Sequence, residues 1–392
     1  MGAMEDAGSI PSQTIRTILT HDFVLGFLGF LAFLAATFAL IPTLPIFLSR
    51  LGSTDAEIGL LVGIFGASSL VCRILVGGAL LTYSEKSVMM VGSMLFALTF
   101  LALVAFRPFW PLVVVRVLQG VAFACLDTAA LAFVVKITPL AYRGRAIGYF
   151  VLAPPFSQAV APAFGMFLIN RYSFTALFLT CAGLCFCSFF FSRRLGRGEV
   201  AISDDGTPSG SSHLFLERKI IAPAIPSFLH GFVWGAVIAF LPLYAIGNGV
   251  TNPGFYFSAV AVMLIAARTL GGRTLDTRSK EKILLTSMSI AMLAMVTLSF
   301  SKTLPMLIVV GMLWGTGSAF FFPACLAYAL DYSGSSAGTA VGTFRALSDL
   351  GVAVGPITMG IMLPHMGYRI MFLALALIFL INICYFQFYV RR

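Results

Sequence analysis

The chain has 392 residues, of which 59% are hydrophobic and only 10% charged, and its mean hydropathy is +0.98. Soluble globular domains carry about a quarter of charged residues, so this composition excludes that class and indicates an integral membrane protein. The formal net charge of +10 comes from Lys and Arg residues scattered over polar segments. Nucleic-acid binding is therefore not expected, because it uses basic residues gathered on one face.

Apolar runs recur along the whole chain, and each is about 20 residues or longer, the length that a helix needs to cross a bilayer. Backbone groups in lipid must be hydrogen-bonded within their own segment, so each run is expected to be a helix. The fold class predicted is an all-α membrane protein with twelve transmembrane helices. The expected spans are residues 21–48, 56–81, 87–106, 109–137, 143–169, 174–192, 221–247, 253–273, 283–301, 303–331, 336–364 and 368–390.

One long polar interruption, residues 193–220, is rich in Gly, Ser and Asp and predicts a flexible linker between two six-helix bundles. A shift of 194 or 195 residues places Arg73 on Arg268, Gly77 on Gly272 and Pro162 on Pro356. This internal repeat is typical of transporters whose two halves rock about a central site. The expected divisions are a tail (1–20), a first bundle (21–192), the linker (193–220) and a second bundle (221–392).

The distribution of basic residues predicts the orientation. With both termini in the cytoplasm, sixteen Lys and Arg residues lie on the cytoplasmic side and five lie outside. The positive-inside rule favours that arrangement. The outer loops are short and carry no Asn-x-Ser/Thr site, so a bacterial inner membrane is the simplest location.

Motifs for catalysis are missing from the sequence. It contains no phosphate-binding loop, no HExxH and no nucleophile elbow. The seven cysteines lie in or beside apolar runs without metal-ligand spacing, which favours packing. We therefore expect no cofactor, no bound metal and no enzymatic activity.

Several motifs resemble the major facilitator superfamily, in particular its proton-coupled drug and solute efflux members. The run "RVLQG", Arg116 to Gly120, is similar to a fourth-helix signature, and "YRGRAIGYF" (142–150) is similar to the turn that follows it. The second half also keeps a loop signature as Arg268, Gly272, Asp276 and Lys280, whereas Leu81 occupies the acidic position in the first half. This resemblance implies transport by alternating access.

The resemblance also implies a set of gating residues. Asp276 is expected near the start of the fifth span, beside Arg143 or Arg145. Small residues in the fifth and eleventh spans, with Ala161-Pro162 in the fifth and Gly355-Pro356 in the eleventh, are expected mainly to allow close helix packing and secondarily to act as hinges. The gating set is Arg73, Gly77, Arg143, Arg145, Arg268, Gly272, Asp276, Pro162 and Pro356.

Ionisable residues inside the spans are the leading functional candidates, because each costs about 2.5–3.5 kcal/mol to insert and normally faces a cavity or a partner. Arg116 and Asp127 are eleven residues apart, so they share one helix face but lie about 16 Å apart. A low-dielectric cavity favours protonated carboxyl groups, which makes Asp127 and Asp349 the first candidates for proton coupling. His230 is a secondary candidate, because imidazole titrates near neutral pH.

Other residues are expected to line the cavity. Arg345 lies one turn before Asp349, so an intrahelical ion pair and a substrate role are equally favoured. The aromatic candidates have packing as their alternative role. The predicted cavity set is Arg116, Gln119, Arg345, Trp234, Trp314 and Tyr328.

These observations predict a monomeric secondary transporter whose partners are a small-molecule substrate, protons and the lipid bilayer. A proton-coupled exporter of a small amphipathic or partly charged solute is favoured. A proton-coupled importer of sugars or organic anions would use the same fold. A lipid or lysolipid flippase would need a laterally open apolar groove, and a sensor that transports nothing is the alternative from another class.

Overall fold

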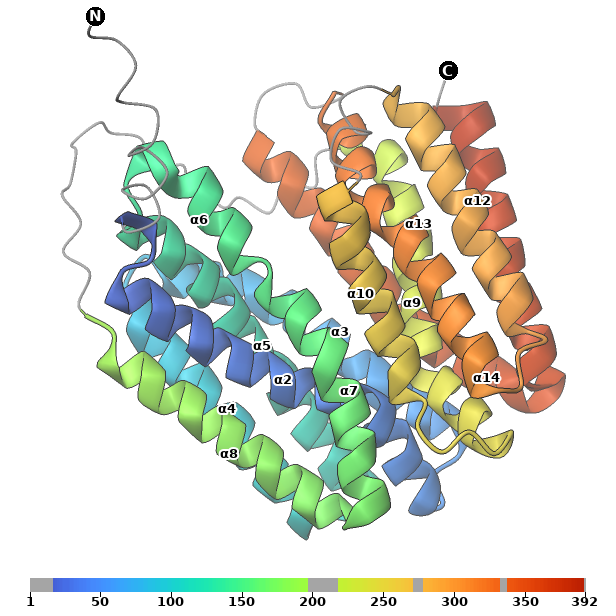
Figure 1. Ribbon diagram of the computed structural model, residues 1–392, viewed down its shortest axis with the longest axis horizontal. Coiled ribbons are helices and arrows are strands. Elements are labelled where there is room, and N and C mark those ends of the chain that lie inside the picture. The colour runs from blue at the N-terminus through green and yellow to red at the C-terminus, as the bar shows by residue number, and fades with distance from the viewer. Residues whose placement is uncertain (1–16, 197–217, 271–277, 332–336, 391–392) are drawn as a thin grey trace, which may run out of the picture.

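The computed structural model describes residues 17–196, 218–270, 278–331 and 337–390. Over these ranges every regular element is a helix, which confirms the all-α prediction (Figure 1). Ten helical segments in the described ranges are long and apolar enough to cross a membrane, and α10 is a shorter apolar helix. The chain is thus a multi-pass helical membrane protein.

The helices of the first half follow the predicted spans closely. Thr54 starts α3 with a capping box, in which its hydroxyl accepts a hydrogen bond from the Glu57 amide and the Glu57 carboxylate accepts one from the Thr54 amide. The elements are α2 (His21–Arg50), α3 (Asp55–Ala79), α4 (Glu85–Ala105), α5 (Phe109–Ile137), the 3₁₀ turn η1 (Leu140–Tyr142), α6 (Arg143–Phe150), α7 (Ala153–Arg171) and α8 (Phe174–Arg194).

The span predicted at 143–169 is divided. α6 ends at Phe150 and α7 begins at Ala153, which is followed by Pro154 and Pro155. Proline lacks the amide proton for the helical hydrogen bond and disfavours helical geometry in the residue before it, so a continuous helix is broken at this point. The interval between α6 and α7 is Val151 and Leu152.

The second half comprises α9 (Arg218–Gly247), α10 (Gly254–Leu270), α12 (Lys280–Leu298), α13 (Leu304–Leu330), α14 (Ala337–Tyr385) and the π-helical turn η2 (Phe386–Val390). Within α14, Gly367 has φ of 70° and ψ of 165°, so the helix is interrupted there. The left-handed region is open to glycine without steric cost, which explains why the reversal falls at this residue.

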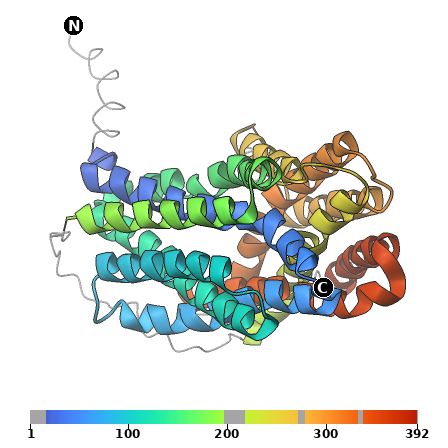
Figure 2. The same ribbon diagram turned by 90° about the horizontal axis from the view of Figure 1, so that it is seen from below.

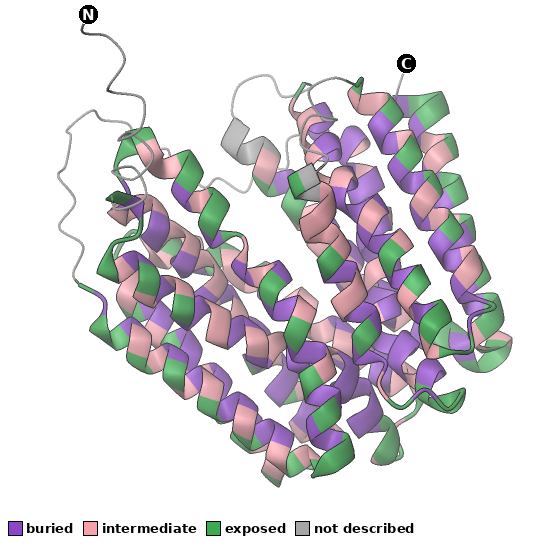
Figure 3. Ribbon diagram, in the orientation of Figure 1, coloured by how far each residue is buried: buried purple, intermediate pink, exposed green. Residues whose placement is uncertain are grey.

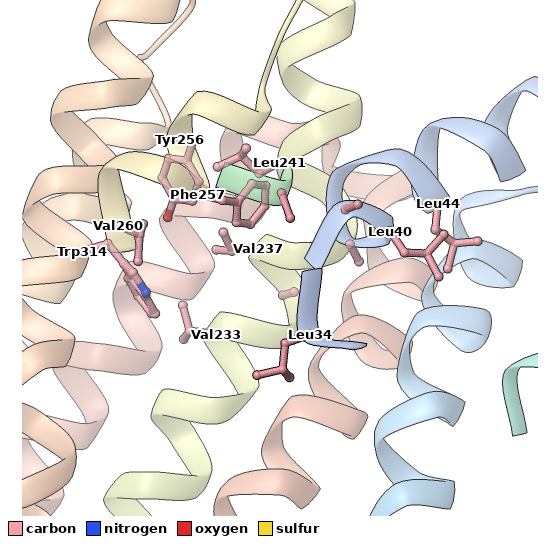
Figure 4. Close-up of a cluster of buried hydrophobic side chains, with 14 of the residues drawn as sticks. Leu34, Leu40, Leu44, Val233, Val237, Leu241, Tyr256, Phe257, Val260 and Trp314 are labelled. Atoms are coloured by element: carbon pink, nitrogen blue, oxygen red, sulfur yellow. The ribbon is translucent and has the colours of Figure 1, made fainter. Parts of the chain in front are cut away.

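The helices α2–α8 lie together, and α9–α14 lie beside them (Figures 1 and 2). Between these groups, α3 packs against α14 and α7 against α10. Figure 3 shows buried and exposed faces alternating along most helices, as expected for helices with one face in a core and one in lipid. One buried cluster joins Val233 and Val237 of α9 to Val260 and Trp314, with Leu34 of α2 next to it (Figure 4).

Candidate functional site

An ion cluster joins three helices from both halves of the chain. Arg73 of α3 lies with its Nη1 atom 2.8 Å from Oδ2 of Asp127 on α5, and its Nε atom is 3.7 Å from Oδ2 of Asp349 on α14. The three side chains are between 22% and 38% exposed, so they are only partly shielded from solvent. The two carboxylates predicted as coupling groups therefore share one arginine, which the sequence had placed in the gating set.

Arg116 is held by the neighbouring helix. It is only 6% exposed, and its Nε donates to the carbonyl oxygen of Leu61 on α3 at 2.8 Å. Its Nη1 donates to Oε1 of Gln119 at 2.7 Å, and its guanidinium lies 4.6 Å from the ring centroid of Phe65. Arg116 thus has a backbone carbonyl of another helix as a partner.

Gly120 explains why α5 can approach α3 so closely at this level. A Cβ atom built on Gly120 would lie 2.4 Å from the Phe65 carbonyl oxygen and 1.9 Å from Oγ of Ser68. Only glycine leaves room for this backbone contact. The motif "RVLQG" thus contains both the glycine that allows the close helix contact and the two polar residues, Arg116 and Gln119, that this contact holds in position.

A cavity of about 190 Å³ lies between the two groups of helices, and Arg116, Arg73 and Asp349 all contribute to its wall. The remaining wall is mostly aliphatic and aromatic. The lining residues are Thr37, Leu40, Ile41, Leu44, Pro45, Val62, Phe65, Gly66, Ser69, Arg73, Phe96, Arg116, Phe123, Gly235, Ile238, Asp349 and Val352.

Two phenylalanines connect the two arginines along the cavity wall. Arg116 lies over Phe65, the rings of Phe65 and Phe123 are 5.5 Å apart, and the Arg73 guanidinium is 5.7 Å from the Phe123 centroid. Cation–π contacts of this kind stabilise an arginine whose surroundings are otherwise apolar. Phe65 and Phe123 were not singled out from the sequence, because one Phe among 38 carries no positional signal.

His230 lies in an aromatic cluster rather than in the cavity wall. It is 2% exposed, its ring stacks on Phe321 at 4.3 Å and on Trp314 at 5.0 Å, and Nε2 is 3.2 Å from Oγ of Ser318. Trp234 stacks on Trp314 at 5.6 Å. The two tryptophans, predicted to line the cavity, are thus part of the packing between α9 and α13.

We expect His230→Gln to retain proton-driven accumulation, because His230 does not contribute to the cavity wall. The loss of its stacking contacts should lower the free energy of unfolding by roughly 0.5–1.5 kcal/mol. Thermal unfolding and flux at several pH values check both statements. Loss of coupling in a variant that folds normally would instead make His230 a primary proton carrier.

The remaining predicted cavity residues lie elsewhere. Arg345 is exposed and does not contribute to the cavity wall, and among the described residues its neighbour Asp349 has its ion-pair contact with Arg73 instead. The hydroxyl of Tyr328 donates to the carbonyl oxygen of Val390 at 3.1 Å, which fastens α13 to the end of the chain.

The predicted gating residues are only partly described. Gly272 and Asp276 lie outside the described residues, as does the side chain of Arg268. Arg143 donates from Nε to the carbonyl oxygen of Thr138 at 3.3 Å, Arg145 is exposed, and a Cβ on Gly77 would meet no atom within 4 Å. Lys280, from the same loop signature, forms an ion pair with Asp331 at 2.8 Å.

Pro162 and Pro356 lie at close contacts between the two halves. A Cβ on Gly59 of α3 would be 2.3 Å from the Pro356 carbonyl oxygen, and a Cβ on Gly254 of α10 would be 2.5 Å from the Pro162 carbonyl oxygen. The sequence repeat relates these two contacts, since Gly59 and Gly254 are 195 positions apart and the prolines 194. Asn170 adds a hydrogen bond from Nδ2 to the carbonyl oxygen of Thr251 at 2.8 Å.

A second, mainly apolar groove of about 580 Å³ lies between α2, α7 and α8. Phe156, Val160 and Phe164 of α7 line it and are 46–67% exposed. On α2 the groove is formed by Phe27, Leu31, Ala35 and Ala39. The cavity instead uses Thr37, Leu40, Ile41 and Leu44, which lie on nearly the opposite face of the helix.

The protein is a helical membrane protein with two related halves and a cavity between them. Ion-paired carboxylates lie beside that cavity. This architecture is that of a transporter. The family model "Major Facilitator Superfamily" matches residues 25–304 and 224–392, so the chain belongs to that superfamily. It is accordingly a transporter and not an enzyme.

Curated relatives include export proteins. The chain is 23% identical over 337 residues to the "Staphylopine export protein" of Staphylococcus aureus, covering 82% of this chain and 84% of that one. It is also 23% identical over 375 residues to the "Multidrug resistance protein MdtG" of Klebsiella pneumoniae, covering 91% and 90%.

Solved structures of similar fold include transporters that are not described as drug exporters. The nucleoside transporter NupG superposes with a TM-score of 0.77 at 16% identity, over 94% of this chain and 98% of that one. A bacterial homologue of the human lysosomal transporter Spinster, solved in an inward-facing and occupied conformation, has a TM-score of 0.77 at 14% identity, over 94% and 95%. At these identities the likeness concerns the fold alone.

Proposed function

We propose that the protein is a proton-coupled exporter that moves a small amphipathic or partly charged solute by alternating access. The observation that carries this proposal is the ion cluster at the cavity, in which Arg73 contacts both Asp127 and Asp349. Protonation of either carboxylate weakens its attraction to the arginine. For Asp349 this changes a contact between the two halves, α3 and α14, and for Asp127 it changes a contact within the first half, between α3 and α5. The relatives include export proteins, which supports export as the direction of transport.

The proposed transporter has twelve spans with both termini in the cytoplasm. Besides the ten apolar helical segments found among the described residues, α10 is counted as one span, and Gly367 divides α14 into two. The bundles are proposed at 21–192 and 221–392, joined by the cytoplasmic linker 193–220 and preceded by the tail 1–20. The protein acts as a monomer in the inner membrane.

In this orientation the paired contacts Gly59–Pro356 and Gly254–Pro162 form the outer gate. α3 and α10 start at the outer face, and both glycines lie within the first turns of these helices. The hydrogen bond between Asn170 and Thr251 lies at the same end. The conformation described is therefore closed toward the outside, and export requires these contacts to separate.

Oriented proteoliposomes test the proposal. Small amphiphiles, organic anions and sugars are added one at a time to vesicles with an imposed pH gradient. Solute accumulation is measured together with proton release from the vesicle lumen. An exporter accumulates solute in inside-out vesicles with an acidic lumen and dissipates the gradient. Accumulation only in right-side-out vesicles with an acidic exterior would support the importer, and absence of flux for every solute would support a sensor.

Lipid movement is the second candidate, because the structure contains an apolar groove of the kind that a flippase needs. Phe156, Val160 and Phe164 in its wall are exposed. It lies across α2 from the charged cavity, however, so a lipid in it does not reach Arg73 or Arg116. Scrambling of a fluorescent lysolipid by the purified protein, with a proton dependence, would favour this function over solute export.

A further inference from the structure

Arg116 carries a buried positive charge without a matching carboxylate. Among the described residues no acidic side chain lies within 4.0 Å of it, and its Nη2 atom has no hydrogen-bond partner there. Gln119, predicted to line the cavity, is fully buried behind Arg116 and does not contribute to the cavity wall, and its side chain accepts a hydrogen bond from Arg116. Unpaired donors on a buried cation are costly, so this end of the cavity is suited to an anionic oxygen.

The other end of the cavity differs from the Arg116 end in that it contains carboxylates. There one arginine, Arg73, is shared by two carboxylates, Asp127 and Asp349, and Asp349 itself contributes to the cavity wall. Arg345, one turn from Asp349, is exposed and outside that wall. With both carboxylates ionised, this end has two negative groups beside Arg73, and Arg345 also acts electrostatically on Asp349, whereas the cavity wall at the Arg116 end has one positive group and, among the residues described there, no carboxylate.

The wall between the two ends is apolar and of limited length. Phe65, which lies under Arg116, is eight residues before Arg73 on α3, a rise of about 12 Å. Phe65 and Phe123 form the wall between the two charged groups. The cavity volume of about 190 Å³ is below the range of roughly 300–1,000 Å³ typical of drug-sized ligands. A small solute fits this space, and a typical drug does not.

From these three features we propose that the cavity binds small zwitterions. The carboxylate of the solute contacts Arg116, its apolar body lies on Phe65 and Phe123, and its ammonium group contacts Asp349. The inference rests on the cavity being the transport site of the proposed function, and it assigns the substrate class of that site. Neither a simple anion nor a simple cation satisfies both ends.

Equilibrium binding to the full-length protein in detergent, without any gradient, tests the assignment. The probes are 8-aminooctanoate, which carries both charges on an extended chain, octanoate, which carries only the anion, and octylamine, which carries only the cation. We expect 8-aminooctanoate to bind at least tenfold more tightly than either of the others. Equal binding of octanoate or octylamine, or no binding of 8-aminooctanoate, overturns the assignment.

Variants at the two ends separate the contacts. Arg116→Gln should weaken the binding of 8-aminooctanoate by at least tenfold and leave the binding of octylamine unchanged. Arg116→Lys should restore part of the affinity for 8-aminooctanoate, because it restores the charge. Asp349→Asn should weaken 8-aminooctanoate while leaving octanoate unchanged. Thermal unfolding of each variant identifies loss of fold. If Arg116→Gln unfolds, the Arg116→Lys and Asp349→Asn measurements still decide the question.

The result is distinguishable from failure of the proposed function. If the protein exchanges protons for another solute of the panel but binds no zwitterion more tightly than the matched anion, the substrate class is wrong and export stands. If 8-aminooctanoate binds with the expected pattern but no variant or gradient affects its flux, binding stands and proton-coupled export fails.

Discussion

Asp127→Asn is expected to reduce proton-driven accumulation of solute by at least tenfold while leaving binding and energy-independent exchange measurable. Asparagine keeps the size of the side chain but cannot be charged, so the 2.8 Å ion pair with Arg73 becomes at most a hydrogen bond from the charged guanidinium to a neutral amide oxygen. Arg73 then retains only its longer, 3.7 Å contact with Asp349. The measurements are flux with and without a pH gradient, and binding of the same solute.

A matched control lies on the same helix. Lys136 of α5 forms an ion pair with Glu85 at 2.9 Å, away from the cavity wall. Glu85→Gln should therefore keep coupling, since it removes a similar contact between helices without touching the cavity. Normal proton-coupled flux in Asp127→Asn would transfer the coupling role to Asp349, and loss of folded protein would point to a structural role for Asp127.

Much of the fold was predictable from hydropathy. The span predicted at 109–137 coincides with α5 (Phe109–Ile137), because a helix in lipid ends where apolar residues end. The predicted span at 143–169 lies within the apolar segment Leu140–Arg171, which consecutive prolines divide into α6 and α7. The break between α6 and α7 depends on the backbone chemistry of proline, and average hydropathy carries no information about it.

The candidate site was predictable only in part. Helical periodicity placed Arg116 and Asp127 on one face, and both side chains contact α3 in the structure. The partner of Asp127 was not identified, because Arg73 belongs to another helix and a single sequence carries no information on which helices are neighbours. The same limit explains why Trp234 and Trp314 were expected in the cavity, since aromatic side chains serve cores and cavities alike.

A substitution at the contact between Gly59 and Pro356 is expected to have a large effect on the outer gate. Gly59→Val is expected to hold the outer gate open, because even its Cβ would lie 2.3 Å from the Pro356 carbonyl oxygen. Overpacking costs about 1–3 kcal/mol, which at 1.4 kcal/mol per factor of ten shifts the gate equilibrium by roughly 5- to 150-fold. The repeat-related Gly254→Val should act in the same direction through Pro162.

Disulfide formation between cysteines introduced by Asn170→Cys and Thr251→Cys measures the gate, because these two residues are hydrogen-bonded across it. In Gly59→Val the rate of cross-linking should fall about tenfold or more and transport should fall with it, since alternating access requires the outer side to close. Gly183→Val is the matched control, because Gly183 is an exposed residue of α8 whose Cβ would meet no atom within 4 Å. Unchanged cross-linking and transport in Gly59→Val would show that the halves keep their close contact by other residues, and that the glycine pair does not form the gate.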